Sequence, residues 1–189
     1  MKRICILASG NGSNTENLIK YFQGNHTIQI SLIGSNNVNA KVLSRAKKYG
    51  IHTLSFNRKQ LNSGDLVSQL RSSDIDFIVL AGFLLKIPKN IIEKYPQKII
   101  NIHPSLLPKY GGKGMYGKYV HEAVFKSQDK ETGITIHFVN EVYDNGVIIF
   151  QAKCTLDSRN SIKAIMKKVK DLELKFFPIV IENILNEQN

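Results

Sequence analysis

The N-terminal half of the sequence alternates between short apolar runs and segments that are polar or have apolar residues at helical spacing. The predicted strands are Arg3–Ala8, Ile28–Gly34, His52–Phe56, Ile75–Leu80 and the segment that begins at Ile99, and Arg3–Ala8 and Ile75–Leu80 are the clearest apolar runs among them. Continuous runs of this kind are typical of strands buried on both faces of a parallel sheet. Residues 57–65 are predicted to form a polar loop, and the alternation as a whole predicts a parallel sheet with helices on both faces.

The C-terminal part departs from this alternation. Residues 133–139 and 147–152 read as two strands joined by a polar turn, which predicts an antiparallel hairpin. From Ser158 to Asn186 apolar residues recur at steps of three and four, as in a long helix that Pro178 should kink or end. The predicted fold is α/β: a Rossmann-like, doubly wound, mostly parallel sheet with a C-terminal hairpin and a long C-terminal helix. One domain spanning residues 1–189 is expected.

A glycine-rich loop, Ser9-Gly10-Asn11-Gly12-Ser13-Asn14, separates the first strand from a predicted helix. Glycines let backbone N–H groups approach an anion, and a helix N-terminus adds oriented donors and a favourable dipole. The spacing matches neither G-x-G-x-x-G nor a Lys-bearing P-loop, so a single phosphate on a small metabolite fits better than a dinucleotide. The alternative is a tight turn in which Ser13 or Asn14 caps the helix.

The stretch Ile99–Tyr110 places a polar pair at the end of an apolar strand. Side chains alternate along an extended chain, so Asn101 and His103 should point to the same side. Ligands of doubly wound sheets bind outside the carboxyl ends of the strands. Because the glycine-rich loop, the apolar loop Ala81–Pro88 and this stretch all leave from such ends, we expect them to form one site.

Asn101, His103 and Asp144 together suggest general acid–base catalysis. A carboxylate near an imidazole favours the protonated ring and raises its pKa, and an asparagine amide can donate to a developing oxyanion. No Ser or Cys is placed as an obvious nucleophile. Acyl transfer by direct attack of a substrate amine would need only these three groups.

Two further features each allow a functional and a structural interpretation. Phe83, Leu84 and Leu85 could line a pocket for a flat apolar ligand, or they could pack in the core. Glu173 falls on the apolar face of the predicted C-terminal helix, where a carboxylate is unusual. It either has a partner at the edge of the helix or contacts a ligand amine.

The formal net charge of +11 is a first indication of nucleic-acid binding, but the lysines are scattered and no nucleic-acid-binding motif accompanies them. They suit equally well a surface that gathers small anionic ligands. The first apolar run is too short for a signal peptide or a spanning helix, so a cytoplasmic protein without membrane contact is expected. Cys5 and Cys154 are isolated, which indicates neither a disulfide framework nor a metal site.

Four segments in this order make the sequence resemble the folate-dependent phosphoribosylglycinamide formyltransferases, and the likeness covers nearly the whole chain. They are Ser9–Asn14, Leu80–Phe83, Asn101–Pro108 and His137–Gly146. The Asn-x-His-Pro-Ser-Leu-Leu-Pro segment is specific to enzymes of folate-dependent formyl chemistry, and the glycine-rich loop narrows the likeness to this family. The related methionyl-tRNA formyltransferases and formyltetrahydrofolate deformylases carry an additional domain, which is not expected at this length.

The resemblance implies that the amine of glycinamide ribonucleotide attacks the formyl carbon of 10-formyltetrahydrofolate, the co-substrate, in purine biosynthesis and without a metal. Asn101 and protonated His103 would stabilise the tetrahedral oxyanion, and Asp144 would hold His103 and a water. The residues implied for the ribonucleotide are Gly12, Ser13, Asn14 and Glu173. Those implied for the folate are Leu84, Leu85, Lys86, Ile87 and Asn101. The phosphate-binding half would span about residues 1–100, and the catalytic and folate-binding half about residues 80–189.

The sequence also departs from the family in two places. Many relatives have a basic residue near position 63 that meets the folate, whereas Ser63 is not basic and only Arg58 and Lys59 lie nearby. The segment Gly111–Gly117 is longer and richer in glycine than usual, and the role of His121 after it stays open. The alternatives are a formyltransferase acting on another amine such as a nucleotide sugar, a deformylase and, more remotely, a nucleic-acid-binding module. Small-molecule partners and a monomer or homodimer are expected.

Overall fold

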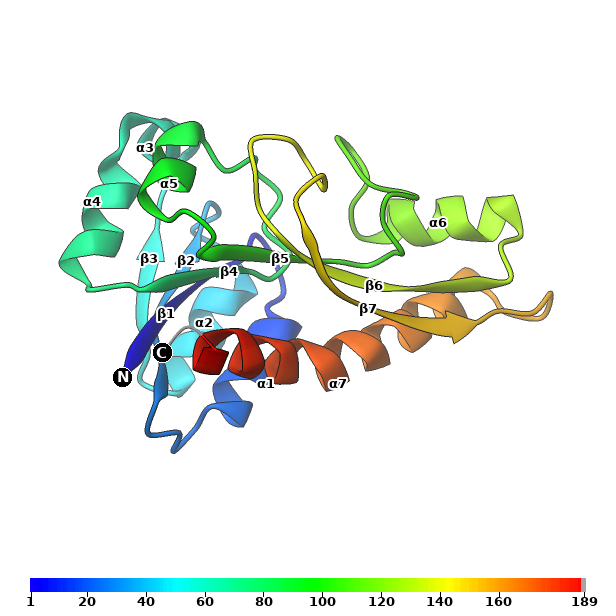
Figure 1. Cartoon of the computed structure of the whole chain (residues 1–189), viewed down its shortest axis with the longest axis horizontal. Coiled ribbons are helices and arrows are strands. Elements are labelled where there is room, and N and C mark those ends of the chain that lie inside the picture. The colour runs from blue at the N-terminus through cyan, green and yellow to red at the C-terminus, as the bar shows by residue number, and fades with distance from the viewer. Residues whose placement is uncertain (188–189) are drawn as a thin grey trace.

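The computed structural model describes residues 1–187 and arranges them as a seven-stranded sheet with helices on both faces (Figure 1). The strands are β1 (Lys2–Leu7), β2 (Ile28–Ser35), β3 (His52–Ser55), β4 (Phe77–Leu80), β5 (Ile99–His103), β6 (Glu131–Phe138) and β7 (Ile148–Thr155). The helices are α1 (Ser13–Tyr21), α2 (Lys41–Lys48), α3 (Arg58–Ser63), α4 (Asp65–Ser72), α5 (Lys89–Lys94), α6 (Lys118–Ser127) and α7 (Ile162–Glu187).

The strand order is β3-β2-β1-β4-β5-β6-β7, and the five strands from β3 to β5 are parallel. Strand β6 runs antiparallel to both β5 and β7, which confirms the mostly parallel sheet with a C-terminal hairpin. The order reverses between β1 and β4, and in doubly wound sheets ligands bind at such a switch point. The loops after these two strands meet there, because Ser9 N donates to the Gly82 carbonyl at 3.0 Å.

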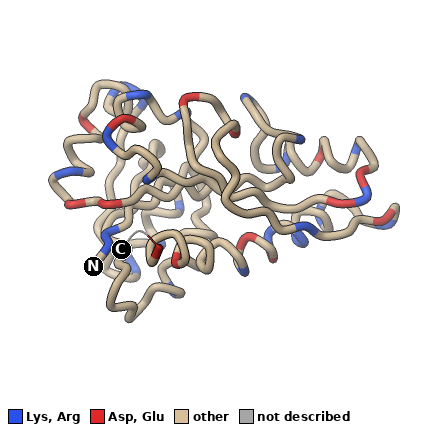
Figure 2. Tube along the Cα trace, viewed as in Figure 1, with Lys and Arg blue, Asp and Glu red and all other residues tan. Residues whose placement is uncertain are grey.

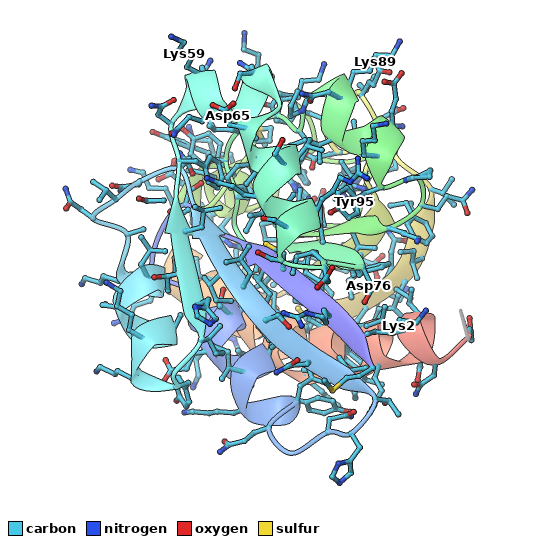
Figure 3. The ribbon with its side chains drawn as sticks, turned by 90° about the vertical axis from the view of Figure 1, so that its left-hand side faces the viewer. Lys2, Lys59, Asp65, Asp76, Lys89 and Tyr95 are labelled. Carbon is cyan, nitrogen blue, oxygen red and sulfur yellow. The ribbon has the colours of Figure 1, made fainter. Side chains whose placement is uncertain are left out.

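The sheet is buried on both faces, which explains its continuous apolar runs. In β1, Ile4 and Ile6 pack into one apolar cluster with residues of α1, α2 and α7, and Cys5 and Leu7 pack into a second cluster with residues of α3, α4 and α5. Figure 3 shows the two helical layers from the side: Lys59, Asp65 and Lys89 mark the helices above the strands, and α1 and α2 lie below. The loops at the carboxyl ends of the strands are thereby held on a rigid base.

The predicted polar loop over residues 57–65 is wrong, since α3 occupies Arg58–Ser63. The Asn57 side chain accepts from Gln60 N at 2.9 Å, and the Gln60 side chain accepts from Asn57 N at 2.9 Å. This capping box satisfies two donors that would otherwise be unpaired at a helix start, so a polar segment forms a helical turn. The short helix α5 after Pro88 was not predicted either.

Helix α7 does not end at Pro178 but continues to Glu187. Pro178 removes one backbone hydrogen bond, yet it is buried beside Phe177, which is only 1% exposed. The helix packs along β6, β7 and α1 (Figure 1), and this apolar packing keeps the helical path beyond the proline.

Lysine and arginine are spread over many elements of the fold rather than gathered on one of them (Figure 2). Within residues 1–187, no helix is long and apolar enough to cross a membrane. The same described part of the chain holds no group of three His, Cys, Asp or Glu side chains that could bind a metal ion.

Candidate active site

A cavity of about 850 Å³ lies at the carboxyl ends of β1, β4 and β5. The glycine-rich loop, the loop after β4 and the loop after β5 all contribute to its wall, together with α7 and the segment before α6. Of the residues predicted for the site, it is lined by Gly12, Ser13, Asn14, Leu84, Asn101, His103, Asp144 and Glu173. The structure therefore brings residues from both ends of the chain around one space.

The glycine-rich loop ends at Gly12, which is the N-cap of α1 and has no side-chain capping hydrogen bond. Its φ of 75° lies in the left-handed region, and a Cβ at this position would come within 2.8 Å of Val42, so only glycine fits. The alternative in which Ser13 or Asn14 caps the helix is thus wrong. Backbone N–H groups of the first turn stay free of a side-chain cap and can bind an anion.

Glu173 reaches the start of α1 from the other end of the chain. Asn14 Nδ2 donates to Glu173 Oε2 at 2.9 Å, and Lys170 Nζ contacts Asn14 Oδ1 at 2.8 Å and Glu173 Oε2 at 2.9 Å. Glu173 therefore has partners at the edge of its helix and also lines the cavity. Lys170 was missed by the sequence analysis, although its spacing of three residues from Glu173 places both on one helix face.

Asn101 lies between two further side chains at the end of β5. Its Nδ2 is 3.1 Å from His137 Nε2 and 3.5 Å from Asp144 Oδ1. His137 Nδ1 lies 2.8 Å from the Phe138 carbonyl, which can only accept, so Nδ1 carries a hydrogen and Nε2 is left to accept from Asn101 Nδ2. His137 thereby fixes the amide nitrogen of Asn101. The sequence pattern alone indicated no role for His137.

His103 and Asp144 form a buried pair. His103 Nδ1 is 3.5 Å from Asp144 Oδ1, and their side chains are 4% and 11% exposed. His103 Nε2 is 2.8 Å from the Tyr110 carbonyl, and Gly112 N donates to Asp144 Oδ2 at 2.9 Å. Both members are therefore held by main-chain groups of the segment that follows Pro108.

The expectation that Asp144 raises the pKa of His103 above its ordinary value is wrong. Burial lowers this pKa below 6.5, and it outweighs the opposing effect of the Asp144 charge. Burial raises the pKa of Asp144, but the neighbouring His137 and His103 side chains and the Gly112 N–H bring it below its ordinary value. Near neutral pH the pair therefore consists of an ionised carboxylate and a neutral imidazole.

His121 of α6 also lines the cavity and is 6% exposed. Its Nδ1 is buried without a hydrogen-bond partner in the part of the chain that the structure describes. Burial lowers the pKa of His121, with Glu173 opposing the shift and His103 adding to it. The neighbouring glycine-rich segment contributes Gly112–Gly117 to the wall.

We expect the free energy of unfolding to fall as the pH drops below 6.5, the ordinary value from which the pKa of both His103 and His121 is lowered. In this window the unfolded chain binds more protons than the folded one, so stability rises with pH. Asp144, with a pKa lowered from 3.8, affects stability only at more acidic pH. Urea unfolding between about pH 7 and pH 5 measures the slope. The dependence of the free energy of unfolding on pH should be weaker in His121→Gln and unchanged in His52→Gln, a control at an exposed histidine. A pH dependence in His121→Gln equal to that of wild type would contradict the role of His121.

A second, smaller cavity of about 60 Å³ adjoins the first. Leu85, Lys86 and Ile87 line only this smaller cavity. The two cavities share Phe83, Asn101, Tyr143 and Asp144. Phe83 is 9% exposed and its ring centroid lies 6.0 Å from that of Phe56, so it packs in the core and also borders both spaces. Among the described residues that line the two cavities, none comes from α3, where Arg58, Lys59 and Ser63 lie.

A family model described as "Formyl transferase" matches residues 2–181 of the chain. The chain belongs to this family. It is 33% identical to the phosphoribosylglycinamide formyltransferase of Bacillus subtilis, with 100% of this chain and 97% of that protein covered. The chloroplastic phosphoribosylglycinamide formyltransferase of Arabidopsis thaliana is 34% identical, and the match covers 99% of this chain but 66% of the plant protein.

The solved structures agree with the sequence relatives. The crystal structure of phosphoribosylglycinamide formyltransferase from Anaplasma phagocytophilum superposes on the chain with a TM-score of 0.89 at 34% identity. The superposition covers 98% of this chain and 88% of that one. The residues that the family model matches, 2–181, include every site residue named above.

Proposed function

We propose that the chain transfers the formyl group of 10-formyltetrahydrofolate to the amine of glycinamide ribonucleotide, giving formylglycinamide ribonucleotide and tetrahydrofolate in purine biosynthesis. The observation that carries the proposal is that two cavities of different character meet at Asn101 and Asp144. The larger has groups that can bind an anion at one end, and the smaller combines apolar side chains with polar ones. A reaction between a phosphorylated amine and a flat acyl donor would take place where they meet.

The larger cavity suits the ribonucleotide. The first turn of α1, beginning after Gly12, supplies N–H donors for the phosphate with Ser13 and Asn14, and Lys170 adds a positive charge beside them. Glu173 lies next to this end and accepts hydrogen bonds from neutral and cationic donors. It is therefore placed to accept from hydroxyl or amine groups of the substrate.

The folate ring is assigned to the smaller cavity together with the adjoining part of the larger one, since about 60 Å³ admits only part of a fused ring. The wall of the smaller cavity combines apolar side chains, among them Leu85, Ile87 and Val139, with the polar Asn140. Flat ligands of mixed polarity bind in pockets that are mainly apolar with a few directed polar groups. Leu84 and Lys86 lie at the same loop and extend this side of the site.

In the first step the amine nitrogen attacks the formyl carbon, a C–N bond forms and the carbonyl electron pair moves to oxygen. Asn101 stabilises this oxyanion through an amide N–H. This N–H is available because its 3.5 Å contact with Asp144 Oδ1 is long for a hydrogen bond and can be exchanged for one to the oxyanion. His137 keeps the amide nitrogen directed to this side. Donors aimed at the developing charge act without reorganisation, which makes them effective.

In the second step the proton of the attacking amine is moved to the leaving nitrogen. The neutral His103 ring accepts this proton, because the developing oxyanion and the Asp144 carboxylate both stabilise the imidazolium. The bond between the formyl carbon and N10 then breaks, its electron pair goes to N10, and the imidazolium returns the proton there. As this bond breaks, the oxyanion re-forms the carbonyl of the product amide, and the proton that the amine loses is the one that N10 gains.

The deciding experiment follows tetrahydrofolate release from 10-formyltetrahydrofolate with and without glycinamide ribonucleotide. We expect release only with the ribonucleotide. Release that is independent of the amine would favour a deformylase and overturn the proposal, and release with an amino nucleotide sugar alone would favour a different amine substrate. The partners proposed are these two small molecules, in the cytoplasm, for a monomer or homodimer.

Replacing Lys170 with Met should raise KM for glycinamide ribonucleotide by about tenfold and leave kcat nearly unchanged, the scale expected for one hydrogen bond to a charged group. Steady-state kinetics measure both constants. Lys163→Met, an exposed lysine near the start of the same helix, is the matched control. With unphosphorylated glycinamide riboside as substrate, Lys170→Met and wild type should behave alike. An equal increase in KM for the riboside would show that Lys170 does not act on the phosphate.

A further inference from the structure

The segment after Pro108 holds both His103 and Asp144 through its main chain. The Tyr110 carbonyl lies 2.8 Å from His103 Nε2, and the Gly112 N–H donates to Asp144 Oδ2 at 2.9 Å. The glycine-rich segment Gly111–Gly117 begins here. These two contacts to the central pair give the segment after Pro108 a defined task in the reaction.

The contact with Tyr110 decides which ring nitrogen of His103 is free. A carbonyl oxygen can only accept, so Nε2 must carry a hydrogen, and in a neutral ring Nδ1 is then without one. We propose that Tyr110 is a positioning residue whose carbonyl holds His103 in the Nε2-protonated form, so that proton transfer in the proposed reaction runs through Nδ1 alone. This inference rests on the proposed function for its catalytic consequence but not for the tautomer itself.

The Asp144 carboxylate by itself would favour the opposite tautomer, with a hydrogen on Nδ1 directed at Oδ1. That ring could not accept a proton on the side of the carboxylate. The distances settle the competition: the 3.5 Å separation of Nδ1 and Oδ1 exceeds a normal hydrogen bond, whereas the 2.8 Å contact to Tyr110 is a good one. By binding Oδ2, the Gly112 N–H helps to keep the carboxylate at this longer separation.

The side chain of Tyr110 anchors its carbonyl. The phenol oxygen lies 2.5 Å from Ser127 Oγ at the end of α6 and donates to Asp129 Oδ2 at 2.9 Å. Tyr110 has a φ of 57°, in the left-handed region that a bulky residue rarely adopts. The clamp on the phenol helps to hold this unfavourable conformation, and with it the direction of the carbonyl.

The charged and titratable groups that act on His103 come from several elements. They are Asp144 and His137 around the hairpin, Glu173 on α7 and His121 on α6. Within the described residues, the hydrogen-bond partner of His103 Nε2 is the Tyr110 carbonyl and none of these four side chains. A change in the Tyr110 anchor should therefore alter the tautomer of His103 without removing a charge from its surroundings.

The direct test is ¹⁵N NMR of histidine-labelled protein at a pH above 6.5, the ordinary histidine value. The His103 signals are assigned by their loss in His103→Gln. We expect a protonated Nε2 and a bare Nδ1. A ring protonated at Nδ1, or a mixture of both tautomers, would overturn the assignment. Because no substrate is present, this result is independent of whether the proposed function is correct.

The second test replaces Tyr110 with Phe. We expect the Nδ1-protonated form of His103 to appear and kcat to fall about fivefold with KM for both substrates nearly unchanged, as for the loss of one ordinary hydrogen bond. The control is Tyr21→Phe, which loses a 2.7 Å phenol bond to Glu182 far from the site. A Tyr110→Phe protein with wild-type kcat and a single Nε2-protonated form would refute the anchoring role.

Discussion

Replacement of His103 by Ala should lower kcat for formyl transfer by about 10²- to 10⁴-fold, the range measured for general acid–base groups. The His103 side chain is 4% exposed, and its Nδ1 lies 3.5 Å from Asp144 Oδ1. Among the described residues, His137 is the other imidazole near this oxygen. Its Nε2 is 3.8 Å from Asp144 Oδ1, and its Nδ1 is hydrogen-bonded to the Phe138 carbonyl, so we do not expect it to replace His103. Without His103 the amine proton has no buried acceptor, and N10 has no donor. Binding of both substrates should change little, because the contacts proposed for them lie elsewhere in the two cavities.

Single-turnover and steady-state kinetics with saturating substrates measure this loss. His26→Ala is the matched control, since His26 is exposed in the turn before β2 and away from the cavity. Thermal unfolding of both variants separates a chemical effect from a loss of fold. If the folded His103→Ala variant had a kcat within a few-fold of wild type, the loss would be far smaller than general acid–base groups cause, and the mechanism would be contradicted.

The Asp144→Asn variant should lose about 10²-fold in kcat or more. The amide has nearly the same shape and its oxygen can still accept from the Gly112 N–H, so the change is mainly the loss of one negative charge. Without that charge the imidazolium of His103, which forms during the reaction, is less stable, because burial already lowers the pKa of this ring.

The pH dependence of kcat distinguishes this effect from a local rearrangement. The inflection assigned to His103 should move to lower pH in Asp144→Asn, since removal of a nearby anion disfavours the charged ring. Asp157→Asn is a suitable control, because Asp157 pairs with Arg159 in the loop before α7 and does not line either cavity. An unchanged profile together with wild-type kcat would exclude Asp144 from proton transfer.

The fold could be predicted from the sequence wherever a single element shows its own pattern. Residues 4–7 of β1 and all of β4 are apolar because both faces of the sheet are covered there, and α7 shows its period over its full length. The prediction failed at residues 57–65, where the capping box at Asn57 makes a helix of a polar segment. Of the two outcomes expected at Pro178, a kink or an end, the end does not occur, because packing carries α7 past the proline.

The candidate site was predicted in part for the same reason. Asn101 and His103 are two residues apart on one strand, so their common direction follows from strand geometry alone. The groups that complete the site carry no such local signal. Lys170 is 156 residues from Asn14, and the Tyr110 carbonyl is a main-chain group that exists next to His103 only because the chain turns back after Pro108.

The order of the strands, the glycine-rich start of α1 and the polar pair at the end of β5 could all be derived from the sequence alone, because each depends on neighbours within a few residues. The helices α3 and α5, the way these groups meet and their protonation states follow from the three-dimensional packing. Burial lowers the pKa of His103 although the Asp144 charge opposes this shift, and the hydrogen bond to the Tyr110 carbonyl sets the tautomer of the ring. The physical reason is that desolvation and hydrogen bonding depend on everything packed around a group, whereas a sequence pattern records only its chain neighbours.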